Sequence, residues 1–313
     1  MKLCVLIPAL NEEQTIADVI NRIPKSIEGI NQIIILVIDD GSNDRTKEIA
    51  QANGAIVFSH PWTMGLGSAF NTGVNEAINN DVDILITIDA DGQFLSEEIP
   101  YLVSPIVEGN ADFVCGDRFT DNQGKLKKPE NMSTLNYWGN LGMSFLISLL
   151  INKRFTDVSS GFRAYSQEAL LQLNLMGKFN FSQEVFIDLS NKGVAIESLP
   201  VSVIYFPDRE SRVAKSLSKY ATNAIKIIFR SYRDYHPLRF FSWLSLFNFL
   251  IGIIFGFLSY RQIINSEMLS RINFFGVIGI YFFSVGTFLI IVGLLADMFV
   301  RIRQNQEKIL YKL

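Results

Sequence analysis

Short apolar runs and longer amphipathic stretches alternate over the first 115 residues. Five short runs are typical of buried strands: Leu3–Pro8, Ile33–Ile38, Ala55–Phe58, Ile84–Ile88 and Asp112–Cys115. The stretches between them have helical patterns: Glu13–Ile23, Thr46–Asn53, Ser68–Asn79 and Glu97–Glu108. Continuous apolar runs are typical of strands covered on both faces, and strand–helix alternation favours a parallel sheet. The pattern predicts an α/β fold with a doubly wound, mostly parallel sheet.

Two later runs are long enough to cross a membrane. Phe240–Tyr260 and Ile272–Ala296 contain no charged residue, and a bilayer core of about 30 Å needs about 20 apolar residues in a helix. Core helices are rarely apolar on every side over such a length, which disfavours the alternative of two buried helices. Since only Arg261–Arg271 separates the runs, we expect a transmembrane helical hairpin at about residues 240–260 and 272–296.

Basic residues flank the hairpin at both ends. The first run is preceded by Lys226, Arg230, Arg233 and Arg239, and the second is followed by Arg301, Arg303, Lys308 and Lys312. By the positive-inside rule, both ends lie in the cytoplasm. We therefore expect a two-span protein of the inner or plasma membrane, with a cytoplasmic domain at 1–215, a juxtamembrane amphipathic helix at 216–237, spans within 238–300 and a cytoplasmic tail at 301–313.

Two more segments favour a membrane surface. Ser216–Tyr235 mixes apolar and basic residues, which predicts an interfacial helix attracted to anionic lipid; an ordinary soluble surface helix is the alternative. Met132–Ile151 is long and apolar but contains Asn136 and Asn140. We expect a helix that lies on the membrane surface or against the functional site, and not a third span.

The composition narrows the class of protein. Of 313 residues, 49% are hydrophobic and only 19% are charged, whereas a soluble domain has about 25% charged residues. The net charge of −3 argues against nucleic-acid binding, which usually requires a basic surface. Two cysteines cannot build a disulfide framework, and with two histidines they make a zinc site improbable.

Acidic residues follow three of the predicted strands. They are Glu12 and Glu13 after the first, Asp39 and Asp40 after the second, and Asp89 and Asp91 after the fourth. The carboxyl ends of parallel strands share one crevice, where so many carboxylates repel one another unless a cation is present. A lone Asp-x-Asp is usually a solvated turn. Three acidic strand ends together predict Mg²⁺ or Mn²⁺, bridged to the phosphates of a nucleoside diphosphate.

The glycines argue against a dehydrogenase or a P-loop enzyme. The turn after the first strand, Pro8–Glu13, has no glycine, and Gly65-Leu66-Gly67 lacks the third glycine of the dinucleotide-binding fingerprint. A Walker A motif is also absent from the sequence. We expect metal and arginines, and not a glycine cradle, to hold the phosphates.

A set of motifs resembles the family-2 inverting glycosyltransferases. They are Pro8-x-x-Asn11-Glu12, Ile38–Ser42, Gly65-Leu66-Gly67, Asp89-Ala90-Asp91, Gly116–Phe119, Asp157–Tyr165 and Gln183-Glu184. Their order and spacing over about residues 1 to 215 are most similar to the polyprenyl-phosphate sugar synthases, the branch of the dolichyl-phosphate mannose synthases. The two-span anchor resembles bacterial members that glycosylate undecaprenyl phosphate. The resemblance implies a GT-A-type fold.

The resemblance also implies roles for individual residues. The nucleotide would contact Pro8, Leu10, Glu12, Ile38, Asp40, Asp89 and Ala90. The metal would be held by Asp89, Asp91 and Gln93. The phosphates and the acceptor would meet Arg118, Arg163, Arg209 and Arg212. The groups implied in catalysis are Asp91, Arg118, Arg163 and Glu184.

One loop departs from the family pattern. The family has an arginine six residues before a lysine, within a glycine-containing loop. Here Ser211-Arg212 matches the Ser-Lys pair, Phe206 occupies the earlier arginine position and the glycine is missing. Arg209 is the candidate to replace that missing arginine, from a position three residues further along the chain. Arginine can replace lysine at a phosphate because its planar fork also binds phosphate.

The resemblance implies metal-dependent, inverting transfer of a sugar from a nucleotide diphosphate sugar to undecaprenyl or dolichyl phosphate. A lipid phosphate is already an anionic nucleophile, so it needs little general base. The alternative is a direct glycolipid or polysaccharide glycosyltransferase with a hydroxyl acceptor, which would need Glu184 or Asp157 as base. A membrane-tethered nucleotide-sugar sensor is disfavoured because Arg118, Arg163 and Arg212 are all present. The sequence leaves open the sugar, the nucleotide and homo-oligomerisation, since glycines in the spans permit packing within or between chains.

Overall fold

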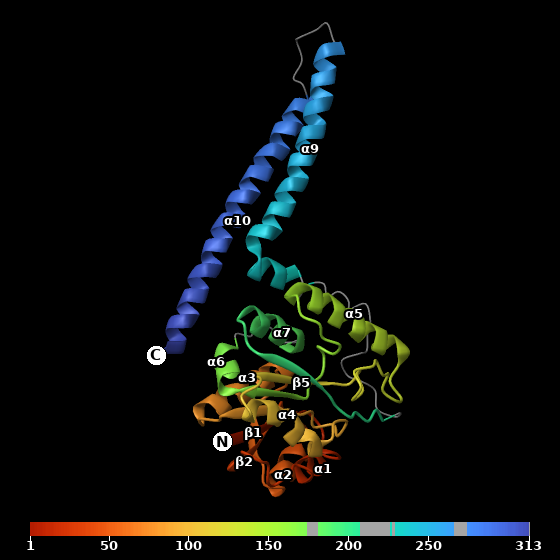
Figure 1. The fold of residues 1–313 in the computed structure, drawn as a ribbon, viewed down its shortest axis with the longest axis vertical. Helices are drawn as coiled ribbons and strands as arrows, with labels where there is room; N and C mark the ends of the chain where they lie inside the picture. Colours follow the sequence, from red (N-terminus) through yellow and green to blue (C-terminus); the bar gives the residue numbers. More distant parts are fainter. Residues whose placement is uncertain (174–180, 207–225, 227–228, 266–273, 313) are drawn as a thin grey trace. The chain divides into compact units, whose positions relative to one another are not determined.

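The computed structural model describes residues 1–173, 181–206, 226, 229–265 and 274–312. The chain divides into two compact units, Met1–Ile228 and Phe229–Leu313. The first unit contains the sheet and the second contains two long helices (Figure 1). Arg209, Arg212 and most of the predicted juxtamembrane helix lie outside the described residues, although 229–235 are helical.

The first unit is built on a seven-stranded mixed sheet in the order β3-β2-β1-β4-β6-β5-β7. The strands are β1 (Lys2–Ala9), β2 (Gln32–Asp39), β3 (Ile56–Ser59), β4 (Ile84–Thr87), β5 (Phe113–Asp117), β6 (Arg163–Ser166) and β7 (Ile196–Pro200). All neighbours are parallel except β6, which runs antiparallel to both β4 and β5. The predicted α/β class and mostly parallel sheet are confirmed.

Helices cover both faces of this sheet. They are α1 (Ile16–Asn21), α2 (Thr46–Ala52), α3 (Leu66–Asn79), α4 (Ile99–Val107), α5 (Thr134–Ile151), α6 (Gln167–Gln172) and α7 (Phe181–Asn191), with a 3₁₀ turn at Ser96–Glu98. Leu3, Val5 and Ile7 of β1 join the core formed with α1 and α4. The alternate residue Leu6 packs on α3 so closely that a Cβ on Gly73 would lie 2.3 Å from it. Burial on both faces explains the continuous apolar run.

The two last strands were not predicted from the sequence. β6 is four residues long and begins with the charged Arg163, and β7 is only partly buried along its length. Neither strand has the continuous apolar run from which the first five strands were predicted. The antiparallel direction of β6 is a further feature that strand–helix alternation does not predict.

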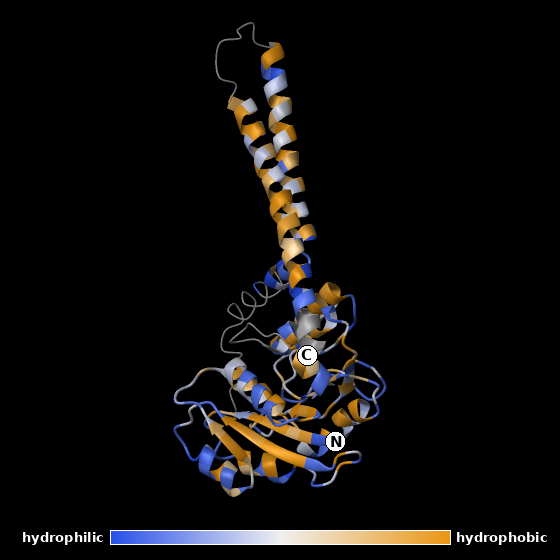
Figure 2. Ribbon diagram, turned by 90° about the vertical axis from the view of Figure 1, so that its left-hand side faces the viewer, coloured by the Kyte–Doolittle hydropathy of each residue, from blue (hydrophilic) through white to orange (hydrophobic). Residues whose placement is uncertain are grey.

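The second unit consists of α9 (Pro237–Asn265) and α10 (Phe274–Lys312). Pro237–Ile264 and Phe274–Arg303 are long and apolar enough to cross a membrane, and both predicted runs lie largely within them. Figure 2 shows that both helices are mostly hydrophobic. Many of their large apolar side chains are exposed, unlike those of a soluble core helix. Length and exposure together suggest association with a membrane.

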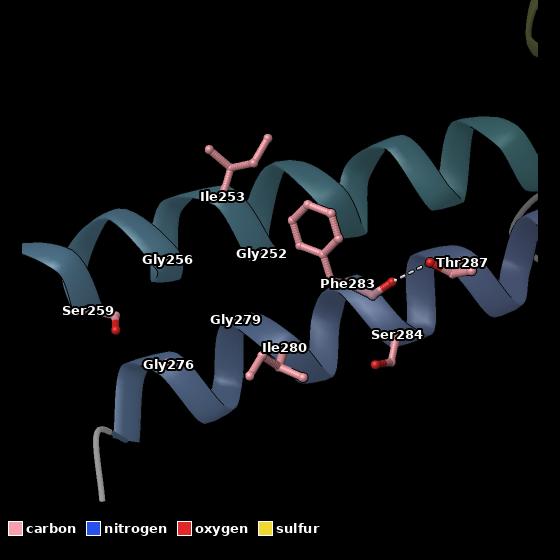
Figure 3. A pocket seen from close by; sticks show the side chains of 10 residues that line it. All are labelled: Gly252, Ile253, Gly256, Ser259, Gly276, Gly279, Ile280, Phe283, Ser284 and Thr287. Carbon is pink, nitrogen blue, oxygen red and sulfur yellow. Dashed lines mark hydrogen bonds between the residues drawn. The ribbon is translucent and has the colours of Figure 1, made fainter.

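Small residues bring α9 and α10 close together. A Cβ on Gly252 would lie 2.7 Å from the Phe283 ring, and one on Gly279 would lie 3.2 Å from the Gly252 carbonyl. Ser245 Oγ donates to the Gly286 carbonyl at 2.7 Å. Beside this contact, a groove is lined by Gly252, Gly256, Gly276, Gly279, Ser259, Ser284 and Thr287, with Ile253, Ile280 and Phe283 (Figure 3). Several of the predicted packing glycines therefore serve contact within one chain.

Candidate active site

The predicted nucleotide-binding residues gather at one edge of the sheet. β1 lies between β2 and β4, so the direction of strand order changes there, which is where open α/β sheets bind ligands. Pro8 pairs with Ile38 in the parallel register of β1 and β2. The Asp40 N–H donates to the Ala9 carbonyl at 2.9 Å. Ile38 itself is fully buried, so its side chain lies beneath the surface of this edge.

The turn after β1 is attached to the turn after β4. Thr15 Oγ1 donates to the Ala90 carbonyl at 2.7 Å and to the Glu12 carboxylate at 3.1 Å. The Glu12 N–H donates to Thr46 Oγ1 at 2.8 Å. Leu10 and Glu12 are partly exposed at this edge. The bonds fix Glu12 and Ala90 relative to each other before any ligand is bound.

Asp40 organises the loop that leads into α3. Its Oδ1 accepts from the Met64 N–H at 2.9 Å, its Oδ2 accepts from the Gly65 N–H at 2.8 Å, and His60 Nδ1 lies 2.7 Å from Oδ1. His60 Nε2 lies 3.0 Å from Thr72 Oγ1. The buried carboxylate therefore stabilises the Gly65-Leu66-Gly67 segment. Sequence reasoning missed His60, whose signal was a lone histidine directly after the third strand.

The Asp89 carboxylate is partly buried, and among the described residues no donor forms a hydrogen bond with it. Burial first, and then the charge of Asp91, raise its pKa to about 7, although Arg118 and Arg163 oppose the shift. A Cβ on Gly161 would lie 2.7 Å from Oδ2 and 2.8 Å from Oδ1 of Asp89, so only glycine fits beneath this carboxylate.

Asp89 and Asp91 fit a divalent cation. No group of three His, Cys, Asp or Glu side chains in the described part of the chain could hold a metal alone. Mg²⁺ and similar ions usually take one or two carboxylates and complete their coordination with substrate phosphates and water. Burial and the charge of Asp91 both raise the pKa of Asp89, and a bound cation would offset both effects. Gln93 donates its backbone N–H to Asp91 Oδ1 at 3.0 Å, and its partly exposed side chain remains a further predicted ligand.

Arg118 is clamped by the fully buried Asp157. Its Nε donates to Asp157 Oδ2 at 2.6 Å, its Nη2 donates to Oδ1 at 3.0 Å, and its Nη1 donates to the Tyr205 hydroxyl at 3.1 Å. Of the five guanidinium N–H groups, one on each Nη has no partner in the described structure. Burial alone would raise the pKa of Asp157, but Arg118 outweighs it and the pKa is lowered. The guanidinium thus presents one fixed edge.

Arg163 has a different environment from the one expected of a phosphate ligand. It is fully buried. Its Nε donates to the Ser160 carbonyl at 2.6 Å, Nη1 to Ser182 at 2.8 Å and Nη2 to Val158 at 2.9 Å. The guanidinium also lies over the Phe113 and Phe186 rings. These contacts join the loop below Asp89 to the start of α7, and they fit a positioning role for Arg163 better than direct contact with phosphate.

The remaining predicted residue on the structure is Glu184. It lies in the first turn of α7 and is partly buried. The charges of Asp91 and Arg118 both act on Asp89. The described site therefore brings these three residues together. Sequence reasoning did not single out Tyr205 as a site residue; its signal was its place directly before the variant loop.

A mostly parallel α/β sheet with an Asp-x-Asp pair after β4 and a clamped arginine after β5 has the arrangement of a GT-A-type glycosyltransferase. The comparison with protein families gives the particular family: residues 4–173 match Glycosyl transferase family 2. The match covers more than half of the chain, so the chain belongs to this family. The resemblance noted from its motifs is confirmed.

Relatives and solved structures agree with this assignment. The chain is 27% identical to Glycosyltransferase AglJ of Haloferax volcanii, over 97% of this chain and 96% of that one. It is 32% identical to the UDP-N-acetylglucosamine–dolichyl-phosphate N-acetylglucosaminyltransferase of Methanococcus voltae, over 64% and 85% of the two chains. The Mycobacterium tuberculosis glucosyl-3-phosphoglycerate synthase, solved with Mn²⁺, UDP and phosphoglyceric acid, aligns with a TM-score of 0.55 at 23% identity, over 75% and 78%. The last likeness shows the fold.

Proposed function

We propose that this glycosyltransferase transfers a sugar from a nucleoside diphosphate sugar to a polyprenyl phosphate, undecaprenyl or dolichyl, with inversion at the anomeric carbon. The observation that carries the proposal is the unsatisfied Asp89 carboxylate beside Asp91, within reach of the Arg118 charge. This pairing suits a diphosphate bound through Mg²⁺ or Mn²⁺. The nucleotide of the M. tuberculosis enzyme and the dolichyl phosphate of the M. voltae enzyme are consistent with these substrates.

The chain's own residues would bind and orient the donor. Pro8, Leu10, Glu12 and Asp40 would surround the base and ribose, and the fixed edge of Arg118 would contact the diphosphate. The bound metal would neutralise charge that develops on the leaving diphosphate. Arg163 would position the loop below Asp89. Arg209 and Arg212, which lie outside the described residues, would bind the acceptor phosphate.

The state of Asp157 supports a phosphate acceptor over a hydroxyl acceptor. A hydroxyl would need a general base, and Asp157 was one of two candidates. Both of its oxygens accept hydrogen bonds, from Arg118 and from the Ser159 N–H at 2.9 Å, and its pKa is lowered. A carboxylate in that state is a poor proton acceptor. Only Glu184 is then left to support the alternative, direct transfer to a glycolipid or polysaccharide hydroxyl.

The exposed side of α5 supports action at a membrane surface. Trp138, Phe145 and Leu149 are 65%, 67% and 72% exposed, and their spacing places them on one helix face. An apolar face of this kind suits the headgroup boundary of a bilayer. We place α9 and α10 across that bilayer, with the catalytic unit and the C-terminus in the cytoplasm.

The test is incubation of the purified full chain with Mn²⁺, a panel of nucleotide sugars, and undecaprenyl or dolichyl phosphate, with mass spectrometry of the lipid product. We expect one glycosyl phosphate lipid, and NMR of its anomeric proton should show the inverted configuration. The matched control replaces the lipid phosphate with the free polyprenol. Transfer to the polyprenol, or to a glycolipid hydroxyl in its place, would contradict the proposal and favour a hydroxyl acceptor.

Sidedness has a separate test. Cys4 and Cys115 are both buried, so a membrane-impermeant thiol reagent reports on introduced cysteines. In intact cells, a cysteine within residues 262–270 should be labelled and one at Lys308 should not. Labelling at Lys308 from outside would overturn the assigned topology.

A further inference from the structure

Tyr205 is held at the metal-binding turn by the backbone around it. The Ile204 N–H donates to the Gln93 carbonyl at 2.9 Å. Phe94 and Val203 form an antiparallel bridge one residue further on. Gln93 follows Asp91 by two residues, so the segment that ends in Tyr205 is in register with the Asp89–Gln93 turn. The position of Tyr205 is therefore fixed relative to the two metal-binding carboxylates.

The side chain of Tyr205 is fixed as well. Its ring packs against the buried cluster of Phe119, Met132 and Tyr137. Its backbone carbonyl accepts a hydrogen bond from Asn131 Nδ2 at 3.3 Å. Its hydroxyl accepts from Arg118 Nη1 at 3.1 Å. Burial raises the pKa of Tyr205 despite the nearby Arg118 charge, so the phenol keeps its proton at neutral pH.

In the described part of the chain, no side chain or backbone group accepts the Tyr205 hydroxyl proton. A phenol has one proton to donate and lone pairs that accept. Within the described residues, the only bond at the hydroxyl is the one that it accepts from Arg118. Because Asp157 clamps Arg118, the guanidinium cannot turn away and the geometry persists. Tyr205 therefore offers an O–H group beside the two unused N–H groups of Arg118.

We propose that the Tyr205 hydroxyl donates a hydrogen bond to a diphosphate oxygen of the sugar donor, next to Arg118. The inference rests on the proposed nucleotide-sugar donor and adds a residue to its leaving-group site. Negative charge on the diphosphate increases as its bond to the sugar breaks, so a fixed donor stabilises the transition state more than the ground state. The phenol keeps its proton throughout, and no covalent step involves it.

The test begins with Tyr205→Phe, which removes only the hydroxyl. UDP and GDP are titrated into the full chain in detergent with Mn²⁺, and the nucleotide that binds the wild type more tightly is used. We expect about tenfold weaker binding, the usual effect of losing a hydrogen bond to a charged group, and a kcat that falls by at least as much. Tyr137→Phe is the matched control, since its ring packs in the same cluster, and it should change neither quantity. Unchanged binding and kcat in Tyr205→Phe would overturn the inference.

A second comparison separates direct contact from an effect through Arg118. Tyr205→Phe is repeated in Arg118→Lys, which keeps a cation beside Asp157, with titrations extended to millimolar nucleotide. If Tyr205 contacts the diphosphate, its loss weakens binding in this background too; if it only orients Arg118, the added change has no effect and the inference fails. Nucleotide titration needs no acceptor. A chain that binds UDP or GDP through Tyr205 but does not glycosylate polyprenyl phosphate would therefore contradict the acceptor alone.

Discussion

The sheet unit and the helical hairpin are both rich in apolar residues, but they differ in what covers them. Leu3, Val5 and Ile7 of β1 are fully buried by helices of the same unit. On α9, Trp243, Phe247 and Phe257 are 69%, 63% and 60% exposed. Monomeric soluble proteins rarely expose apolar surface on this scale. The strands of the first unit are thus covered by protein, whereas the exposed apolar side chains of the hairpin suggest association with a membrane.

The same contrast separates two aspartates of the catalytic unit. Asp157 is fully buried and has its charge balanced by Arg118, which lowers its pKa. Asp89 has no hydrogen-bond donor among the described residues and a pKa raised to about 7. Asp157, which is paired with Arg118, has a structural role. Asp89, which has no such partner among the described residues, marks the proposed ligand site. Substitutions at sites of both kinds test this distinction.

The largest effect is expected at the proposed metal site of Asp89 and Asp91. Asp91→Asn should lower the transfer rate by about 100-fold or more, because it removes a cation ligand at the leaving group. Excess chelator should do the same to the wild type, with recovery on adding Mn²⁺. Activity is measured as labelled lipid product, and thermal unfolding of the variant should stay close to that of the wild type. Glu97→Gln, at an exposed site, is the control; full turnover in chelator would refute metal dependence.

Two truncations test the contrast between the sheet and the hairpin. Leu3→Ala removes a fully buried side chain and should cost about 2 to 5 kcal/mol of stability. Phe257→Ala removes a larger side chain that is 60% exposed, and should change stability by about 0.5 kcal/mol or less, as at other exposed sites. The measurement is thermal unfolding of the full chain in detergent. Equal losses would mean that Phe257 packs against protein and not against lipid.

Features that depend on a local run of residues could be predicted from the sequence. Features that depend on contacts between distant residues could not. The first five strands could be predicted because burial on both faces requires continuous apolar runs. The two long C-terminal helices could be predicted because their apolar runs are as long as a membrane span. Asp89 and Asp91 are visible because they follow a strand. The clamp of Arg118 by Asp157 joins residues 39 positions apart, and the burial of Arg163 beside Phe113 and Phe186 depends on packing. Residue type alone does not distinguish a phosphate-binding arginine from one saturated by carbonyls.

A smaller effect is expected from the pH dependence of the metal-free protein. The folded state raises the pKa of Asp89 from 3.8 to about 7, so it binds the proton more tightly than the unfolded chain. This contribution to stability is complete below pH 4 and is lost as the pH rises through 7. Asp89→Asn should therefore be about 1 to 2 kcal/mol more stable than the wild type at pH 8, after allowance for solvent screening.

The matching measurement at low pH supplies the control. At pH 4 the unfolding curves of Asp89→Asn and the wild type should coincide, because Asp89 is then largely neutral in the folded state. Adding Mn²⁺ at pH 8 should stabilise the wild type and leave the variant unchanged. A variant that is less stable than the wild type at pH 8 without metal would show that Asp89 is satisfied internally, as Asp157 is.

The smallest effect concerns α5, which has an exposed apolar face as the helices of the hairpin do. A fluorophore on Phe145→Cys should be quenched by nitroxide lipid in anionic bilayers, whereas the same fluorophore on Asn80→Cys, an exposed site just after α3, should not. Trp138→Ser should raise the apparent KM for polyprenyl phosphate about fivefold, the equivalent of about 1 kcal/mol of lost interfacial burial. If the label at position 145 is quenched no more than the label at position 80, the α5 face does not lie preferentially against lipid, and the acceptor would then have to reach the site by another side.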